Sequence, residues 1–403
     1  GYLPREELIA LADRLSLPLY RIQEVVSFFP HYQIEPPKRC EIHVCRDMAC
    51  ALRGSGAVAR QLQASLGSRS DVVVKTVSCL GRCDRAPAVR VSSHEAMHGQ
   101  ADRAAAHDHA TTAILGLSVE ETISRVTACA SSHSNAGQQV EHHDDIRYPA
   151  TEPNQWRINV YANQPESARY ESIRRFIAAT GDEKGYDAEC ARIVRELEAA
   201  GLLGMGGAGG RTYKKWSEVR QAAGETKYVV CNGDESEPGT FKDRELLLRT
   251  PYLVLEGVIL AGLFLRASRG YIYIRHEYEE QIELMRREIE RAVSMGLCGD
   301  NILGSGRSFA VEVFVSPGGY ICGEQTALVE AIQDHRAEPR NRPPELQTNG
   351  LHDMPTLLNN VETLAWVPSI VLRDGTWYAQ QAARPDSRGA RFFSVSGDVM
   401  RPG

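Results

Sequence analysis

The stretch "KYVVCNGDESEPGTFKDR", residues 227–244, joins a short β-branched run to an acidic loop. The run "KYVVCN" is typical of a buried β-strand, and "GYIYIR" (270–275) and "FAVEVFVS" (309–316) have the same character. Helical patterns such as "DAECARIVRELEAAGL" (187–202) alternate with these runs. This alternation predicts an α/β domain of parallel strands joined by crossover helices, with ligands beyond the carboxyl ends of the strands. We therefore expect the chemistry in loops that follow strands.

The composition is that of an ordinary globular protein of two or three domains. The chain has 403 residues, of which 42% are hydrophobic and 24% charged, and its net charge of −6 argues against a nucleic-acid partner. Its longest apolar stretch, residues 252–265, contains Glu256 and is shorter than the roughly 20 residues of a membrane-spanning helix. It predicts a buried core helix, and we expect no direct membrane insertion.

The beginning of the chain, "GYLPREELIALADRL", is an amphipathic helix pattern rather than a signal peptide. Without a secretory signal, the ten cysteines are better interpreted as reduced thiols and metal ligands than as disulfides. These features predict a cytoplasmic protein.

The first part of the chain predicts a small α/β domain. Two amphipathic helices over residues 1–30 precede short strand-like runs, and Ser118 with Glu121 forms a capping box that predicts a further helix. The strand-like runs are "CEIHVC" (40–45), "DVVVKTVSC" (71–79) and "APAVRV" (86–91), with the helical pattern "GSGAVARQLQASLG" (54–67) after the first.

Four cysteines follow predicted strands in two pairs. "VCRDMAC" contains Cys45 and Cys50, and "SCLGRC" contains Cys79 and Cys83. Four such thiolates can hold a [2Fe–2S] cluster or a tetrahedral zinc ion. Zinc usually prefers the tighter C-x2-C spacing, so these longer loops favour the cluster, while unligated core thiols are a third interpretation. Cys40, Cys129, Cys190 and Cys298 are most simply small core or surface residues.

The motif "CRDMAC…CLGRC" behind a two-helix start resembles the thioredoxin-like [2Fe–2S] domain. That domain occurs in the small subunit of complex I and fused to related flavoprotein subunits of formate dehydrogenases and hydrogenases. The resemblance covers residues 1–91 and implies that the four cysteines ligate the cluster. For the histidines that follow, at positions 94, 98, 107 and 109, we expect a solvated loop rather than a metal site.

The glycine-rich stretch "GMGGAG" (204–209) follows a helical pattern, whereas a dinucleotide fingerprint follows a strand. It therefore favours a nest of backbone N–H groups that holds an anion, supported by Lys214 and Lys215, over an ordinary Rossmann turn.

Three further loops are rich in polar side chains. The acidic loop of residues 231–244 suits ribose or ribityl hydroxyls, although it could be only an acidic turn before a helix. "GGYICGEQTALVEAI" (318–332) predicts a helix beginning near Glu324, whose N-terminus can face an anion. "LLNNVETLAWVPSI" (357–370) offers two amides that can both donate to and accept from a flavin ring edge.

Together these four segments resemble the NADH-binding flavoprotein (FMN) subunit of complex I and related formate dehydrogenase and hydrogenase diaphorase subunits, over about residues 195–403. The resemblance implies that Glu237 helps to position NADH and that hydride transfer by FMN needs no protein acid–base pair. The residues that it places around FMN are Gly204, Gly206, Gly207, Lys215, Asn232, Asp234, Glu235, Tyr320, Gly323, Glu324, Asn359 and Asn360.

Several positions depart from the family pattern on the NADH side. Gly210, Glu218 and Glu345 stand where the family commonly has phenylalanines that stack on adenine. Gln325 stands where a glutamate is usual, and Arg342 where lysine is common. The flavin-contacting set is nearly intact, so these departures make NAD(H) a doubtful substrate.

The predicted architecture is therefore a thioredoxin-like [2Fe–2S] domain (1–129), a linker (130–165), a Rossmann-like FMN-binding α/β domain (166–388) and the start of a β-grasp domain (389–403). A [4Fe–4S] cluster is expected only if the chain continues beyond Gly403. Partners are expected to be other subunits of a formate dehydrogenase, hydrogenase or complex-I-like assembly, in the cytoplasm or at the membrane periphery through those subunits.

Two functions, and a third without redox activity, remain open from the sequence. The first is an NADH dehydrogenase (diaphorase)-type subunit that moves a hydride between NAD(H) and FMN and then single electrons to iron–sulfur clusters. The alternative is an FMN/[2Fe–2S] subunit that has lost or altered NAD(H) binding and relays electrons between protein partners. The third is a zinc-stabilised scaffold.

Overall fold

The computed structural model describes residues 2–94, 110–131, 139–141, 152–224, 226–384 and 386–403. It divides into two compact units. The N-terminal unit is Gly1–Ala150 together with two later segments, Ser236–Phe241 and Ser394–Gly403. The second unit is Thr151–Glu235 with Lys242–Phe393.

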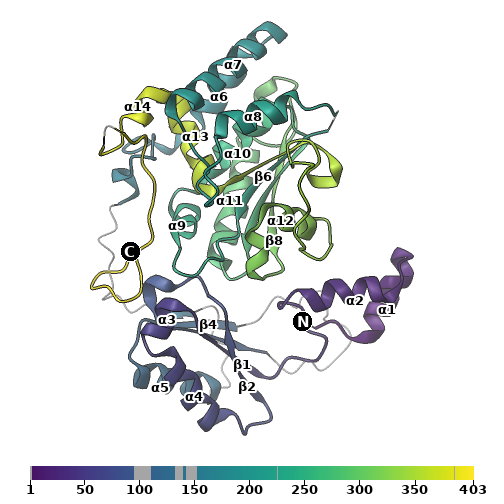
Figure 1. Cartoon of the computed structure of the whole chain (residues 1–403), viewed down its shortest axis with the longest axis vertical. Helices are drawn as coiled ribbons and strands as arrows, with labels where there is room; N and C mark the ends of the chain where they lie inside the picture. Colours follow the sequence, from purple (N-terminus) through teal and green to yellow (C-terminus); the bar gives the residue numbers. More distant parts are fainter. Residues whose placement is uncertain (1, 95–109, 132–138, 142–151, 225, 385) are drawn as a thin grey trace. The chain divides into compact units, whose positions relative to one another are not determined.

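The N-terminal unit is a five-stranded sheet with strand order β2-β1-β3-β4-β5. β1 pairs parallel with β2 and antiparallel with β3, and α4 and α5 pack against each other and against the sheet (Figure 1). Its elements are α1 (Arg5–Leu15), α2 (Leu19–Phe28), β1 (Cys40–Cys45), α3 (Met48–Leu52), α4 (Ser55–Leu66), β2 (Val72–Val77), η1 (Cys83–Arg85), β3 (Ala88–Ser93), β4 (Ala110–Leu115), α5 (Val119–Ser131) and β5 (Gln139–Glu141).

The sequence predicted most of these elements. The two N-terminal helices, the strand of residues 40–45 and the helix after it are confirmed. The capping box is confirmed as well, because the N–H of Ser118 donates to Glu121 Oε2 over 3.0 Å and the N–H of Glu121 to Ser118 Oγ over 3.2 Å. β4 was missed, and His98, His107 and His109 lie outside the described residues.

The second unit contains a four-stranded sheet with order β8-β7-β6-β9, and every neighbouring pair is parallel. Its elements are α6 (Glu171–Ala179), α7 (Glu183–Ala200), α8 (Thr212–Gln221), β6 (Tyr228–Gly233), α9 (Lys242–Arg249), α10 (Pro251–Leu265), β7 (Arg269–Arg275), α11 (Glu279–Ser294), β8 (Ala310–Ser316), α12 (Gln325–Ile332), β9 (Thr356–Asn360), α13 (Val361–Arg373) and α14 (Gly375–Ala379). Short 3-10 turns include η3 (Pro153–Gln155), η4 (Glu166–Ala168), η5 (Ile302–Gly304), η6 (Tyr320–Gly323) and η7 (Leu351–Asp353).

The strand order reverses between β6 and β9. From β6 the chain proceeds to β7 and β8 on one side, and β9 then pairs on the other side of β6. In open parallel sheets, ligands bind beyond the carboxyl ends of the strands at such a reversal. The loop after Gly233 and the direct junction of β9 with α13 at Asn360 therefore lie where a ligand is expected.

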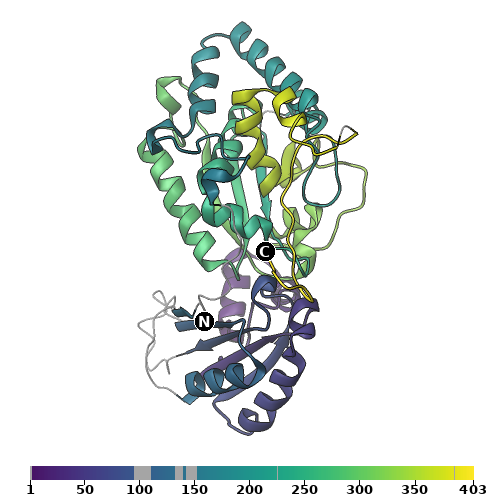
Figure 2. The ribbon, with the colours of Figure 1, turned by 90° about the vertical axis from the view of Figure 1, so that its left-hand side faces the viewer.

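Helix α10 forms the centre of this unit's core, as the sequence predicted. Its residues from Tyr252 to Leu265 are buried, and it packs against α13, β6 and β7. Helices α10 and α13 are labelled in Figure 1, and Figure 2 shows the same ribbon turned by 90°. Within the described residues no single helix is long and apolar enough to span a membrane, although the sharply bent pair α9 and α10 meets the length and composition criteria together.

Two segments differ in local structure from the sequence expectation. Residues 152–165 fall in the expected linker, yet Ile158, Val160 and Tyr161 are buried in the core of the second unit. Residues 389–403, where we expect the start of a β-grasp domain, form neither helix nor strand. Their last part, Ser394–Gly403, belongs to the N-terminal unit.

Candidate functional site

The four predicted cluster cysteines come together in the N-terminal unit. Cys45 ends β1, Cys50 lies on α3, and the Sγ atoms of Cys79 and Cys83 are 3.2 Å apart. Hydrogen bonds with Cys50 and Cys79, together with burial, raise the pKa of Cys45. The two pairs are therefore neighbours, as a shared cluster requires.

The donor set fits a two-iron cluster. All four thiols are at most 5% exposed. The described residues contain no group of three or more His, Cys, Asp and Glu side chains in single-ion geometry. In a [2Fe–2S] cluster each iron takes two thiolates, which is what two adjacent cysteine pairs can supply.

The glycine-rich loop of the second unit is closed at its base. The N–H of Gly204 donates to the carbonyl of Gly210 over 2.8 Å, and Leu203 and Arg211 form an antiparallel bridge. A Cβ atom at Gly207, Gly209 or Gly210 would meet nothing within 4 Å. Gly207 has φ +109° and Gly209 φ +67°, which favour glycine. The loop thus presents bare backbone, as an anion nest requires.

This loop lies against the carboxyl end of β9. A Cβ atom at Gly206 would stand 3.3 Å from the Cβ of Asn360, and the N–H of Met205 donates to Thr363 Oγ1 over 2.9 Å. The structure therefore brings the glycine-rich loop and Asn360, which were predicted separately, next to each other.

Helix α8 follows the loop and carries Lys215 and Trp216. Nζ of Lys215 donates to Gln325 Oε1 over 3.2 Å and to the carbonyl of Leu358 over 3.1 Å. Burial and the nearby Arg342 guanidinium lower the pKa of Lys215. The indole of Trp216 is fully buried and donates to Asn359 Oδ1 over 3.1 Å, so α8 is fixed to the same strand end.

At the end of β6, Asn232 connects two loops. Its Nδ2 donates to the carbonyl of Gly323 over 2.9 Å, and its Oδ1 accepts from the N–H of Asp234 over 3.1 Å. A Cβ at Gly323 would approach the Asp234 carbonyl to 3.1 Å, so glycine permits this contact. Asn232, Asp234 and Gly323 therefore form one cluster.

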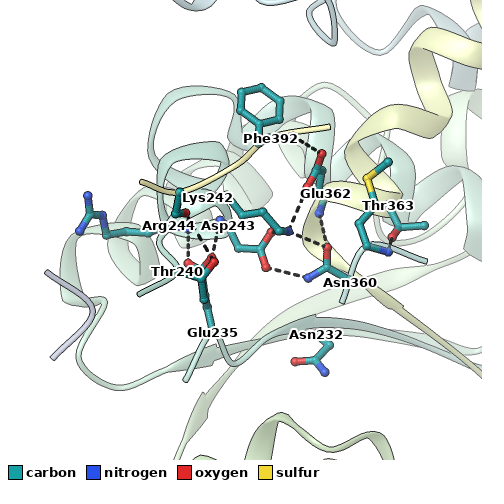
Figure 3. A network of polar contacts seen from close by, with 12 residues as sticks. Asn232, Glu235, Thr240, Lys242, Asp243, Arg244, Asn360, Glu362, Thr363 and Phe392 are labelled. Atoms are coloured by element: carbon teal, nitrogen blue, oxygen red, sulfur yellow. Dashed lines mark hydrogen bonds and ion pairs between the residues drawn. The ribbon is translucent and has the colours of Figure 1, made fainter. Parts of the chain in front are cut away.

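Glu235 faces protein rather than open space. Its carboxylate accepts the N–H groups of Asp243 and Arg244 over 3.0 Å each (Figure 3). It also accepts the hydroxyl of Tyr278 over 3.1 Å. Its carbonyl accepts from Arg275 Nη1 over 2.6 Å. Burial, with Asp243 adding to it, raises the pKa of Glu235 to about 7. The residue thus caps the N-terminus of α9.

Figure 3 also shows a polar network that the sequence analysis missed. Nζ of Lys242 lies 2.7 Å from Asp243 Oδ1, 3.0 Å from Glu362 Oε2 and 3.3 Å from Asn360 Oδ1. Asn360 Nδ2 donates to Asp243 Oδ2 over 2.7 Å. Burial alone would lower the pKa of Lys242, but Asp243 and Glu362 together raise it. The available signal was the "KDR" at the end of the acidic loop and a glutamate two residues after Asn360.

Glu324 caps α12, which begins where the sequence predicted. Its Oε2 accepts the N–H groups of Thr326 (2.8 Å) and Ala327 (2.9 Å), and its Oε1 lies 2.6 Å from Arg342 Nη2. The N–H groups at the start of α12, which the sequence suggested could face an anion, thus bind the carboxylate of Glu324. Tyr320, in η6, is 61% exposed, and Glu237 is exposed and belongs to the N-terminal unit.

Three of the departing residues lie near Lys215. Arg342 lowers the pKa of Lys215, whereas Glu218 and Glu345 raise it. Arg342 Nη1 is 3.8 Å from Glu345 Oε2. Gln347 Nε2 donates to Glu218 Oε2 over 3.2 Å. Exposed carboxylates therefore stand where the family resemblance implies aromatic rings.

Comparisons with known families match two separate parts of the chain. The thioredoxin-like [2Fe–2S] ferredoxin family matches residues 1–109, and the Nuo51 FMN-binding domain matches residues 197–369. These matches confirm the two resemblances drawn from the sequence.

Curated relatives and solved structures agree with this. One subunit of the NADH-quinone oxidoreductase of Salmonella typhimurium is 39% identical over 64% of this chain and 58% of its own length. NADH dehydrogenase [ubiquinone] flavoprotein 1, mitochondrial, of Dictyostelium discoideum is 42% identical over 52% of this chain and 44% of its own. A crystal structure of NAD+-reducing [NiFe]-hydrogenase in the air-oxidized state matches 99% of this chain and 64% of that chain, with a TM-score of 0.76 and 28% identity.

Proposed function

We propose that this chain, which matches the thioredoxin-like [2Fe–2S] ferredoxin family in its first part and the Nuo51 FMN-binding domain in its second, is the NADH dehydrogenase (diaphorase)-type subunit of a multi-subunit redox complex. The chain spans 58% or less of the two curated relatives described above, so the activity of the whole protein is part of the proposal. Its partners would be the other subunits of a complex-I-like, hydrogenase or formate dehydrogenase assembly, in the cytoplasm or at the membrane periphery.

One observation carries the proposal. The bare glycine loop, Lys215, Asn232 and Asn360 gather beyond the carboxyl ends of β6 and β9, where the strand order reverses. Backbone N–H groups and a cation suit a phosphate, and amides suit the edge of a flavin ring. The residues present therefore fit FMN.

FMN would supply the redox chemistry, and the protein residues would bind and orient it. FMN, when bound, exchanges two electrons as a hydride with NADH and can give them up singly to an iron–sulfur cluster. The glycine loop and Lys215 would hold its phosphate, and Asn232, Asp234, Asn359 and Asn360 would orient it. The Lys242 network and the carboxylate of Glu235 hold the ends of α9 and α13 and so fix the loops that carry those residues. No protein acid or base is needed at the reacting atoms.

A second function is favoured by one feature. Glu218 and Glu345 place two exposed carboxylates beside Lys215, where negative charge disfavours the pyrophosphate of a dinucleotide. Under this alternative the chain keeps FMN and the cluster but exchanges electrons with protein partners rather than with NAD(H).

Cofactor analysis of the purified chain tests the part that both functions share. We expect flavin and broad iron–sulfur absorption bands, with one FMN and two irons per chain. A colourless protein that contains zinc would contradict both functions and favour a scaffold.

A further inference from the structure

The loop Ser236–Phe241 follows β6 in the sequence, yet it belongs to the N-terminal unit. Phe241 is 2% exposed and packs in one apolar group with Ala49, Cys79 and Cys83. The N–H of Phe241 donates to Ser394 Oγ over 2.9 Å, so the last segment of the same unit holds the loop in place. The ring therefore covers the second cysteine pair.

Each cluster cysteine has a backbone hydrogen-bond partner. The backbone of Asp47 forms a hydrogen bond with Cys45, and the backbone of Ala88 forms one with Cys50. The N–H of Gly81 lies 3.4 Å from Cys79 Sγ. These three donors come from the segment that carries the cysteines.

The donor to Cys83 comes from far along the chain. The N–H of Gly239 lies 3.3 Å from Cys83 Sγ. Gly239 has φ +102°, a conformation that L side chains rarely adopt, so glycine is needed for this N–H to be presented. The set of four donors is complete only when residues 236–241 are in place.

We propose that this loop, residues 236–241, is a determinant of the reduction potential of the [2Fe–2S] cluster. Gly239 supplies the hydrogen bond to Cys83, and Phe241 excludes water from Cys79 and Cys83. The inference rests on the [2Fe–2S] part of the proposed function.

The direction of the effect follows from charge. One-electron reduction adds a negative charge to the cluster, so N–H donors and water near the sulfurs both stabilise the reduced state. Removing the Phe241 ring admits water to two thiolates, and water replaces any Gly239 N–H that moves away. Loss of the ring therefore raises the midpoint potential.

An EPR-monitored redox titration of the cofactor-loaded full chain tests this. We expect Phe241→Ala to shift the midpoint of the [2Fe–2S] signal to higher potential. Phe29→Ala is the matched control, because Phe29 is also 2% exposed in the same unit but is not grouped with the cluster cysteines, and it should titrate like the wild type. Equal midpoints for Phe241→Ala and the wild type would overturn the inference.

A measurement on the unaltered chain covers the case in which the variant loses its cluster. Pulsed EPR of the reduced cluster in protein labelled with 15N-glycine should detect two coupled glycine nitrogens, those of Gly81 and Gly239. Detection of one alone would overturn the inference. A wild-type chain without any [2Fe–2S] signal would instead overturn the proposed function, so the two failures are distinguishable.

Discussion

Nζ of Lys242 lies 3.0 Å from a carboxylate oxygen of Glu362, although α9 and α13 are far apart in the sequence. The same amine contacts Asp243 at 2.7 Å, and both carboxyl residues are at most 4% exposed. One buried cation therefore compensates two buried carboxylates at the starts of two helices. This contact therefore joins the start of α9 to the start of α13, next to Asn360.

Replacing Lys242 by methionine should lower the free energy of unfolding by about 3–5 kcal/mol, because two buried carboxylates lose their counter-ion. Urea unfolding at neutral pH measures this. Lys214→Met, at an exposed position on α8, should change it by less than about 0.5 kcal/mol. Adding Glu362→Gln to Lys242→Met should recover part of the loss. Equal free energies of unfolding for Lys242→Met and Lys214→Met would contradict this role of Lys242.

The cluster ligands can be separated from the other thiols by iron content. We expect serine at Cys45, Cys50, Cys79 or Cys83 to reduce iron below two per chain and to bleach the broad visible bands. Cys129→Ser, at a half-buried position outside the constellation, should retain both irons. Full iron content in any of the four ligand variants would remove that cysteine from the assignment.

Glu256 should make stability depend on pH. It is fully buried on α10, and burial raises its pKa from the ordinary 4.5 to about 7 despite hydrogen bonds from Ser172 and Tyr161. The folded chain then keeps a proton that the unfolded chain releases, so this residue's contribution to stability falls as pH rises from about 4.5 to about 7. The full loss is about 3 kcal/mol.

The variant Glu256→Gln should remove this dependence. Denaturant unfolding at pH 5 and pH 8 should show a smaller decrease for Glu256→Gln than for the wild type. Glu312→Gln, at an exposed position on β8, should follow the wild type. An unchanged difference between the two pH values in Glu256→Gln would contradict a titrating Glu256.

Aromatic rings on the NADH side should strengthen dinucleotide binding. A side chain at Gly210 meets open space, and Glu218 and Glu345 are exposed, so phenylalanine is accommodated at all three positions. Each stacked ring contributes on the order of 1 kcal/mol, so the triple variant should lower the KM for NADH at least about tenfold. Steady-state NADH oxidation with an artificial acceptor measures it.

The control for that experiment is Glu283→Phe on α11, which is exposed and should leave the KM unchanged. A triple variant with the wild-type KM would show that the departing positions do not contact the dinucleotide. Turnover that appears only in the triple variant would favour the alternative function, in which the wild type has lost NAD(H).

Much of the fold could be predicted because most of the strands in the second unit have a recognisable local sequence pattern. β6, β7 and β8 are β-branched runs bounded by turn residues, and α10 is apolar apart from Glu256. β9 was missed because "TLLNN" is short and ends in two asparagines, which disfavour strands, and its pairing with β6 arises only in the folded sheet.

The site could be predicted only as a set of residues, not as a set of contacts. A carboxylate such as that of Glu235 can face a ligand or cap a helix, and the choice depends on Tyr278 and on where α9 begins. The placement of Gly239 and Phe241 beside the cluster cysteines was also hidden, because local periodicity carries no information about pairing between distant segments.

An anaerobic titration of the cofactor-loaded chain with NADH tests the central claim most directly. Flavin absorbance and the EPR signal of the [2Fe–2S] cluster are followed together, with dithionite as the control for full reduction. The proposed function predicts that NADH bleaches the flavin and that the signal of the reduced cluster then appears. Oxidised flavin and an EPR-silent cluster at millimolar NADH, in a sample that dithionite reduces fully, would contradict it.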